Sequence, residues 1–248
     1  MAGHSKWSNI KHRKGAQDAK RGKLFTKLGK ELTIAAKEAG GDPNFNPRLR
    51  LAIDKAKAAN MPKDNLERAI KKGTGELDGV DYMEIRYEGY GPEGTAFIVE
   101  VVTDNKNRSA SEVRATFSRR NGNLGTDGAV SWMFQRKGEI IVAAEGVDAD
   151  ELMMAALEAG AEDVKEEDGE FTVLTDSADC NAVAEELKKA GYNVTEAEVA
   201  MIPDNKVQIT DLETAKKVMA LYEGLDDLDD VNDVYSNFDI SDELLEQL

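Results

Sequence analysis

Apolar residues in the first third of the chain recur every three or four positions, the spacing of a helix that buries one face. The first such run consists of Leu24, Leu28, Leu32, Ala35 and Ala39. Gly40-Gly41 ends this run, Asn46-Pro47 caps and opens a second helix, and Pro62 opens a third that stops near Gly73. The pattern predicts a small all-α domain of three short helices.

Beyond Tyr82 the apolar residues follow strand-like patterns over shorter stretches. The expected elements are strands 83–88 and 96–103, a helix at 109–120, a strand at 130–134, a helix at 211–222 and a strand at 230–238. A second set lies between them: strand 137–143, helix 150–159, a hairpin of strands 163–167 and 170–175, helix 177–190 and strand 193–200. This βαββαβ order is that of a ferredoxin-like plait.

These elements predict a multidomain α and α+β fold. An N-terminal three-helix domain is followed by two α/β domains, the last of them a ferredoxin-like plait inserted in the middle one. The insertion follows if helix 211–222 and strand 230–238 complete the unit that begins at Tyr82. The expected domains are residues 1–76, residues 77–136 together with 204–248, and residues 137–203.

The charge is divided unevenly along the chain. Residues 1–73 hold 18 Lys/Arg against 7 Asp/Glu and residues 74–248 hold 14 against 41, so the net charge of −16 conceals a basic N-terminal module. Neutralisation of phosphates supplies most of the sequence-independent affinity of proteins for nucleic acid. The charge distribution therefore predicts a polyanionic partner for the N-terminal module.

The basic residues of this module fall on an N-terminal arm and on the first helix. Lys20, Lys23, Lys27 and Lys30 share one sector of that helix, mostly opposite its apolar face. Trp7 and the two histidines of the arm could stack on exposed bases. The expected nucleic-acid-binding residues are His4, Lys6, Trp7, Lys11, His12, Arg13, Lys14, Lys20, Arg21, Lys23, Lys27 and Lys30. The alternative interpretation is a solvated helix face with a soluble tail.

A second basic cluster lies on and before the helix expected at 109–120. Its members are Lys106, Arg108, Arg114, Arg119 and Arg120. Ser109 with Glu112 matches a capping box, and a helix N-terminus preceded by basic residues is a candidate phosphate site. A well-capped helix without a ligand explains the same residues.

Signals for catalysis, metals and cofactors are weak. Gly89, Gly91 and Gly94 match a dinucleotide fingerprint formally, but a strand follows them where the fingerprint needs a helix. The two histidines lack cysteines or paired carboxylates nearby, and Cys180 has no histidine after it. We therefore expect no catalytic residue, no metal, no cofactor and no enzymatic activity. The single cysteine and the lack of a long apolar run favour a cytoplasmic protein with no membrane contact.

Several motifs together carry a resemblance to a known family. They are MAGHSKWSNIKHRK at 1–14, DP at 42–43, NPRLR at 46–50, NMPKD at 60–64, ERAIKKG at 67–73, YEGYGP at 87–92, TDNKNR at 103–108, LG at 124–125, DDV at 229–231 and VY at 234–235. On these motifs the chain resembles the YebC family over nearly its whole length, with Lys106 and Trp132 as small departures. The resemblance implies an all-α domain, two α/β domains and a non-enzymatic regulator of gene expression.

The resemblance leaves two kinds of target open. Many members are described as DNA-binding transcriptional regulators, whereas others, including the mitochondrial activator of cytochrome oxidase translation, look like ribosome-associated translation factors. The helix spacing lacks a clear helix-turn-helix, and the basic arm with interleaved aromatic residues suits ribosomal RNA. Our hypothesis is that the arm and first helix hold a phosphate backbone while the acidic α/β body stays away from it.

A protein partner for that acidic body is a third possibility. Segment 223–233 mixes Leu225, Leu228 and Val231 with acidic residues, which would suit an adaptor surface. The simpler interpretation is an edge strand and loop kept soluble by charge.

Overall fold

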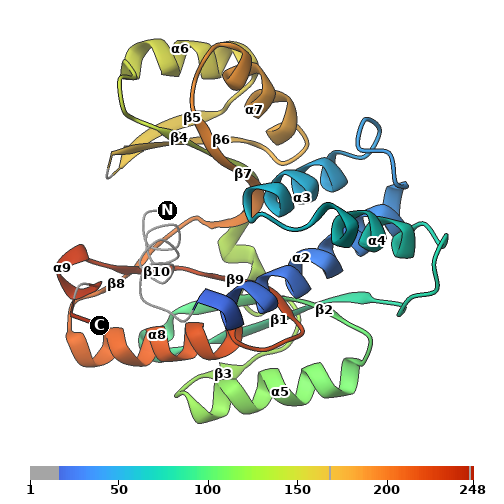
Figure 1. Cartoon of the computed structure of the whole chain (residues 1–248). Coiled ribbons are helices and arrows are strands. Elements are labelled where there is room, and N and C mark those ends of the chain that lie inside the picture. The colour runs from blue at the N-terminus through green and yellow to red at the C-terminus, as the bar shows by residue number, and fades with distance from the viewer. Residues whose placement is uncertain (1–16, 168, 246) are drawn as a thin grey trace. The chain divides into compact units, whose positions relative to one another are not determined.

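A computed structural model describes residues 17–167, 169–245 and 247–248. The described chain divides into two compact units, Gln135–Ile202 and a larger unit formed by residues 17–134 together with Pro203–Leu248 (Figure 1). No helix in these described ranges is long and apolar enough to cross a membrane. The two units are described in turn below, beginning with the larger one.

The three predicted N-terminal helices are present. They are α2 (Gln17–Ala39), α3 (Pro47–Ala58) and α4 (Lys63–Gly73). Asn46 caps α3 by accepting a hydrogen bond from the Leu49 amide, while its own side-chain amide donates to carbonyls at the end of α2. Leu32, Leu49 and Ala56 are fully buried between the helices. Gly73 ends α4 against α2, where a Cβ atom would lie 2.3 Å from the Thr33 carbonyl oxygen.

A four-stranded sheet of order β3-β1-β2-β9 forms the centre of the larger unit (Figure 1). Its strands are β1 (Met83–Tyr90), β2 (Ala96–Thr103), β3 (Asn123–Leu124) and β9 (Val231–Ser236). β2 is buried along almost its whole length because it lies between β1 and β9. The pairing of β2 with β9 joins residues on either side of the plait, so the predicted insertion is confirmed.

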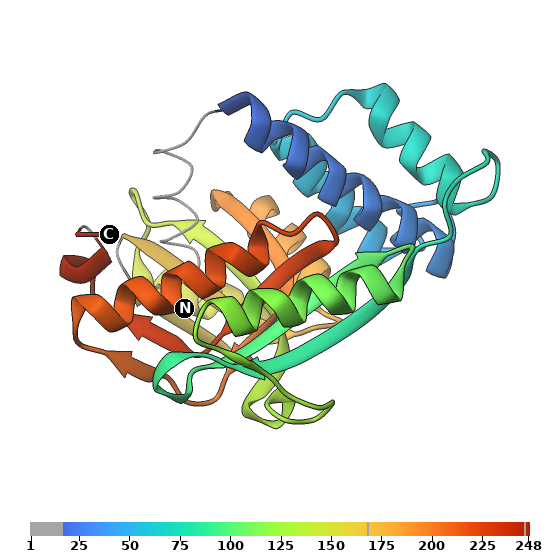
Figure 2. The ribbon, with the colours of Figure 1, turned by 90° about the horizontal axis from the view of Figure 1, so that it is seen from below.

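Two helices, α5 (Lys106–Arg119) and α8 (Leu212–Asp226), lie side by side on one face of this sheet (Figure 2). Phe97 of β2 and Phe117 of α5 meet edge to face with ring centroids 6.2 Å apart. Leu221 and Leu225 of α8 complete a core in which all four side chains are fully buried. α8 ends at Asp226 and β9 begins at Val231, so residues 227–230 join this helix to the sheet.

The smaller unit is a ferredoxin-like plait, as predicted. Its strand order, β5-β6-β4-β7, is the order that a βαββαβ plait requires. Ile140, Leu152 and Leu187 are fully buried in it. The elements are β4 (Phe134–Ala143), α6 (Ala149–Ala159), β5 (Asp163–Glu167), β6 (Glu170–Asp176), α7 (Cys180–Lys189) and β7 (Val194–Pro203).

Three expected elements differ from the structure. The helix expected at 109–120 begins earlier, because Asn105 caps it by accepting from the Arg108 amide, and Ser109 is buried inside the helix. The strand expected at 130–134 is instead a 3-10 turn, η2 (Ser131–Met133), whose first amide, that of Ser131, donates to the Glu88 carboxylate and not to a neighbouring strand. The strand expected at 230–238 is two strands, since β10 (Phe238–Ile240) leaves β9 and pairs in parallel with the unpredicted β8 (Val207–Ile209).

Two short elements remain. A 3-10 turn, η1 (Pro92–Gly94), joins β1 to β2, and α9 (Asp242–Leu245) follows β10.

Candidate nucleic-acid interface

Three lysines of α2, Lys23, Lys27 and Lys30, face the acidic segment that joins α8 to β9. Lys27 Nζ lies 2.7 Å from Asp226 Oδ1 and also donates to the Asp226 carbonyl. Lys23 Nζ lies 3.7 Å from a carboxylate oxygen of Asp227 and 3.8 Å from one of Asp229. These contacts hold the N-terminal helix against the α/β part of the same unit.

Lys30 makes the most deeply buried of these contacts. Its Nζ donates to Asp230 Oδ1 at 3.0 Å, to the Asp229 carbonyl at 2.8 Å and to the Val102 carbonyl at 3.1 Å. The ring of Tyr82 lies 5.8 Å from the same nitrogen. Only 9% of Lys30 is exposed, so its charge is compensated inside the protein and not by solvent.

Asp230 is the acceptor at the centre of this network. Besides Lys30, it accepts from Arg108 Nη2 at 2.7 Å and from Thr103 Oγ1 at 2.9 Å. Burial acts to raise the pKa of the Asp230 carboxyl, but hydrogen bonds from Lys30, Arg108 and Thr103 outweigh burial and lower it below its ordinary value. The carboxylate therefore stays charged and joins α2, β2 and α5 at one point.

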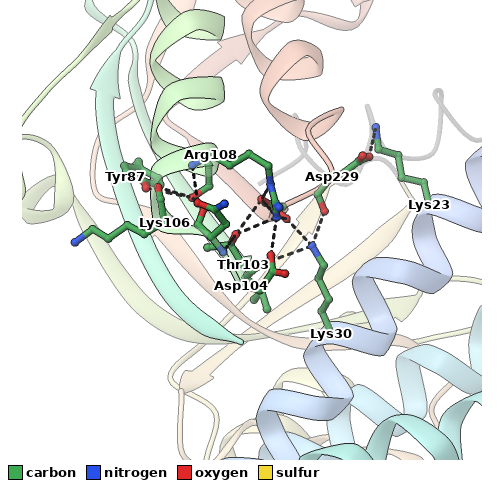
Figure 3. Close-up of polar contacts among 12 residues, drawn as sticks. Lys23, Lys30, Tyr87, Thr103, Asp104, Lys106, Arg108 and Asp229 are labelled. Carbon is green, nitrogen blue, oxygen red and sulfur yellow. Dashed lines mark hydrogen bonds and ion pairs between the residues drawn. The ribbon is translucent and has the colours of Figure 1, made fainter. Parts of the chain in front are cut away.

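Arg108 enters the network from the first turn of α5. Hydrogen bonds to Asp230 and then to Asp104 raise the pKa of its guanidinium above the ordinary arginine value. Figure 3 shows Lys30 and Arg108 pointing toward each other from the two helices, whereas Lys106 points away from both. Arg108, which the sequence predicts to bind phosphate, is thus bonded to the carboxylates of Asp104 and Asp230.

The expectation of an open lysine stripe on the first helix is therefore wrong for Lys27 and Lys30. Both lie against aspartates because the acidic segment 226–230 packs on the face that the charge pattern assigns to a phosphate backbone. The acidic body does not stay away from the basic helix. Lys23 differs, since its side chain is 32% exposed and its carboxylate partners are 68% and 90% exposed.

The other predicted binding residues fall into three groups. His4, Lys6, Trp7, Lys11, His12, Arg13 and Lys14 lie outside the described residues, as does the side chain of Lys20. Arg21 is exposed at the start of α2. On and after α5, the exposed residues Lys106, Arg114, Arg119 and Arg120 make no ion pair with any residue that the structure describes. These five described cations are therefore available to a ligand.

The acidic partners were missed by reasoning from the sequence. Asp226, Asp227, Asp229 and Asp230 had been assigned to an edge strand and loop kept soluble by charge. One signal was available in the sequence. The four aspartates at 226–230 are equal in number and opposite in charge to the four lysines that share one face of the first helix. Spacing along the chain does not show that two such sets meet.

A second group of charges also belongs to internal packing. Arg48 of α3 contacts Glu31 and Glu38 of α2 and Glu84 of β1.

No cluster of His, Cys, Asp and Glu side chains within the described ranges could hold a metal ion.

The fold defines a class of multidomain α+β proteins, in which a three-helix domain precedes an α/β domain that carries an inserted ferredoxin-like plait. Within that class the chain belongs to the TACO1/YebC family. Residues 5–76 match the family's N-terminal domain, and residues 82–238 match its second and third domains.

Relatives of the chain match it over its full length. A probable transcriptional regulatory protein of Fusobacterium nucleatum subsp. nucleatum is 75% identical over 248 residues, which is 100% of both chains. A probable transcriptional regulatory protein of Halothermothrix orenii is 56% identical over 250 residues, covering 100% of this chain and 99% of the relative. The crystal structure of a conserved hypothetical protein from Aquifex aeolicus matches with a TM-score of 0.83 and 49% identity, over 92% of this chain and 94% of the other.

Proposed function

We propose that this protein is a nucleic-acid-binding regulator of gene expression that acts without catalysis. The observation that carries the proposal is the excess of 18 Lys/Arg over 7 Asp/Glu in residues 1–73 of a protein whose net charge is −16. The relatives named probable transcriptional regulatory proteins support a regulatory role. A basic segment in an acidic protein suits recognition of phosphates more than it suits general solubility.

The ion pairs of α2 divide the basic residues between two roles. Lys27 and Lys30 hold the helix in place, because both are largely buried and bonded to aspartates. The arm residues Lys6, Lys11, Arg13 and Lys14, together with Arg21, supply the phosphate contacts of the proposal. Lys23 lies between these roles, since a phosphate could replace its exposed carboxylate partners at little cost.

Direct binding of oligonucleotides tests the proposal. We expect the full chain to bind DNA or RNA of fixed length, and a triple Lys11, Arg13, Lys14→Ala variant to bind much more weakly. A charge-matched control replaces Lys165, Lys188 and Lys189 by Ala, three exposed lysines that pair with acidic residues two or three positions away. Equal loss of binding in the triple variant and the control would contradict a specific role for the arm.

A ribosome-associated RNA-binding factor is the second candidate. Trp7, His4 and His12 interleave with the cations of the arm, and aromatic side chains among cations suit unstacked RNA bases. Sedimentation of cell extract separates the two candidates. Comigration with ribosomal subunits that survives DNase favours RNA, whereas recovery of defined DNA fragments favours a transcriptional target.

A further inference from the structure

The outer face of helix α6 in the ferredoxin-like plait is apolar. Eight large apolar side chains are exposed among the described residues, and three of them, Met153, Met154 and Leu157, lie on this one helix. Their exposed fractions are 42%, 61% and 51%. Leu157 lies three residues after Met154 and four after Met153, so it is a helical neighbour of both and the three form one patch. Single exposed apolar residues are ordinary, whereas a contiguous group indicates an interaction site.

The neighbouring helix α7 shows that the plait does not need an apolar outer face. α6 and α7 lie side by side on the same face of the sheet (Figure 1). α7 buries Val183 and Leu187 almost completely and directs the ion pair of Lys189 with Glu186 to solvent. α6 likewise buries Leu152, which is 0% exposed, so it already supplies the core. The outer apolar residues of α6 are therefore additional to what the packing of the plait requires.

Negative charge surrounds the α6 patch, formed by Met153, Met154 and Leu157. Helix α6 has no basic residue, and its acidic residues Asp150, Glu151 and Glu158 are all exposed. These three carboxylates form no ion pair with any residue that the structure describes. Asp150 and Glu151 suit the positive N-terminal end of the helix dipole, but Glu158 lies in the last turn, where a negative charge is unfavourable. The stability of the helix thus does not explain the acidic border.

The whole plait shares this charge. Residues 135–202 contain 18 Asp/Glu against 5 Lys/Arg, a net charge of −13 in a chain whose total is −16. Four of the five cations, Lys137, Lys165, Lys188 and Lys189, pair with acidic residues of the plait itself. A ligand that approaches α6 therefore meets a strongly negative surface.

This charge decides which occupant suits the patch. A second copy of the chain in a twofold contact would bring two acidic borders together, because the same surface then lies on both sides. Nucleic acid and anionic lipid surfaces would be repelled for the same reason. A protein that presents Lys or Arg beside apolar residues matches both the patch and its border. Methionine side chains are flexible and polarizable, so they adapt to such a partner.

We propose that the outer face of α6 is a docking surface for a basic amphipathic helix of another protein. The apolar stripe of that helix packs on Met153, Met154 and Leu157, and its Lys or Arg residues lie beside Glu151 and Glu158. Helices pack by laying such stripes against each other. The inference is independent of the proposed function, because it concerns the acidic plait and a protein partner.

Methyl NMR of the full chain tests the docking surface directly. Among the eight methionines, Met153 and Met154 report on the patch, and the buried Met201 and Met219 are internal references. The probe is a synthetic peptide of about 18 residues, long enough to form a helix, with Leu on one face and Lys at the flanking positions. We expect saturable shifts of the Met153 and Met154 methyl signals, while those of the buried references stay in place.

A charge-reversed peptide and two variants identify the cause of binding. The peptide with Glu in place of Lys keeps the apolar face and should bind at least about 10-fold more weakly, because like charges then meet. Glu151→Gln with Glu158→Gln should weaken binding of the Lys peptide and leave the apolar patch intact.

Removal of the patch itself is the second arm. Replacing Met153, Met154 and Leu157 by Gln should abolish binding of the Lys peptide. The matched control replaces Leu77, Val80 and Met83 by Gln, three residues of the larger unit that are 43%, 50% and 44% exposed, and should bind normally. Thermal unfolding of both variants should stay near that of the wild type, since exposed positions contribute little to stability.

Several results would overturn the docking surface. They are the absence of saturable shifts with the Lys peptide, equal binding of the Lys and Glu peptides, and full binding by the variant that lacks the patch. If that variant unfolds, the comparison of the two peptides on the wild-type protein still decides. A dimer in analytical ultracentrifugation that the Gln variant dissociates would assign the patch to a second copy of the chain and contradict a basic partner.

Discussion

Replacement of Asp230 by Asn tests whether the buried ion network holds the basic helix to the α/β domain. The change keeps the shape of the side chain and removes the charge that compensates Lys30, whose side chain is 10% exposed beside a carboxylate that is 6% exposed. Breaking a buried pair by removing one partner costs about 3–5 kcal/mol. Two carbonyl oxygens remain bonded to Lys30, so we expect a loss near the lower end, about 3 kcal/mol in the free energy of unfolding.

Urea denaturation measures this loss. Asp227→Asn is the matched control, because Asp227 pairs with Lys23 at a 68% exposed site, where a pair contributes about 1 kcal/mol or less. A loss for Asp230→Asn no larger than that of the control would refute the reasoning. The unfolding curve should be fitted for two transitions, since the plait forms its own compact unit.

The same network predicts a pH dependence. The pKa of Asp230 is lowered in the folded protein, so its contribution is fully present above the ordinary aspartate pKa of about 3.9 and is lost as the pH falls through the lower folded value. The stability difference between wild type and Asp230→Asn should therefore be constant near neutral pH and shrink in acid. A difference that grows in acid would contradict this assignment.

Three further predictions follow from other contacts. Replacing Asp227 and Asp229 by Asn removes the two carboxylates that compete with phosphate for Lys23, so oligonucleotide affinity should rise several-fold. Glu185 and Glu186→Gln on α7, which also removes two negative charges, is the charge-matched control. The Glu88 carboxylate accepts hydrogen bonds from the Gly128, Val130 and Ser131 amides, and Glu88→Gln places an amide donor beside these donors, which should loosen the loop that carries Trp132. In a Trp7→Phe variant, where Trp132 is the only tryptophan, its fluorescence anisotropy should therefore fall. An unchanged anisotropy would show that Glu88 does not hold this loop. Gly73→Ala should destabilise the helical domain by about 1–3 kcal/mol in thermal unfolding, whereas Gly29→Ala, which meets no atom within 4 Å, should not.

Much of the fold could be predicted because local signals agree with tertiary packing. Asn46-Pro47 defines the start of α3, and the apolar run 96–103 corresponds to the buried strand β2. The βαββαβ order fixes the plait, since that order permits few compact arrangements. The pairing of β2 with β9 could not be predicted in this way. It joins residues more than a hundred positions apart, and the spacing of apolar residues within each strand does not show which strand is its neighbour.

The site was harder to predict than the fold. The helical spacing of Lys23, Lys27 and Lys30 correctly places them on one face, but the spacing does not show what covers that face. Ser109 matched a capping pattern that Asn105 satisfies four residues earlier.

The salt dependence of nucleic-acid binding tests the central claim most directly. If the basic arm, Arg21 and Lys23 neutralise about six phosphates, the logarithm of the binding constant should fall with the logarithm of salt concentration with a slope of about −5. The Lys11, Arg13, Lys14→Ala variant should have a slope shallower by about 2 to 3, corresponding to the three lost cations. A slope near zero for the full chain, or an equal slope for the variant, would contradict phosphate recognition by the N-terminal module.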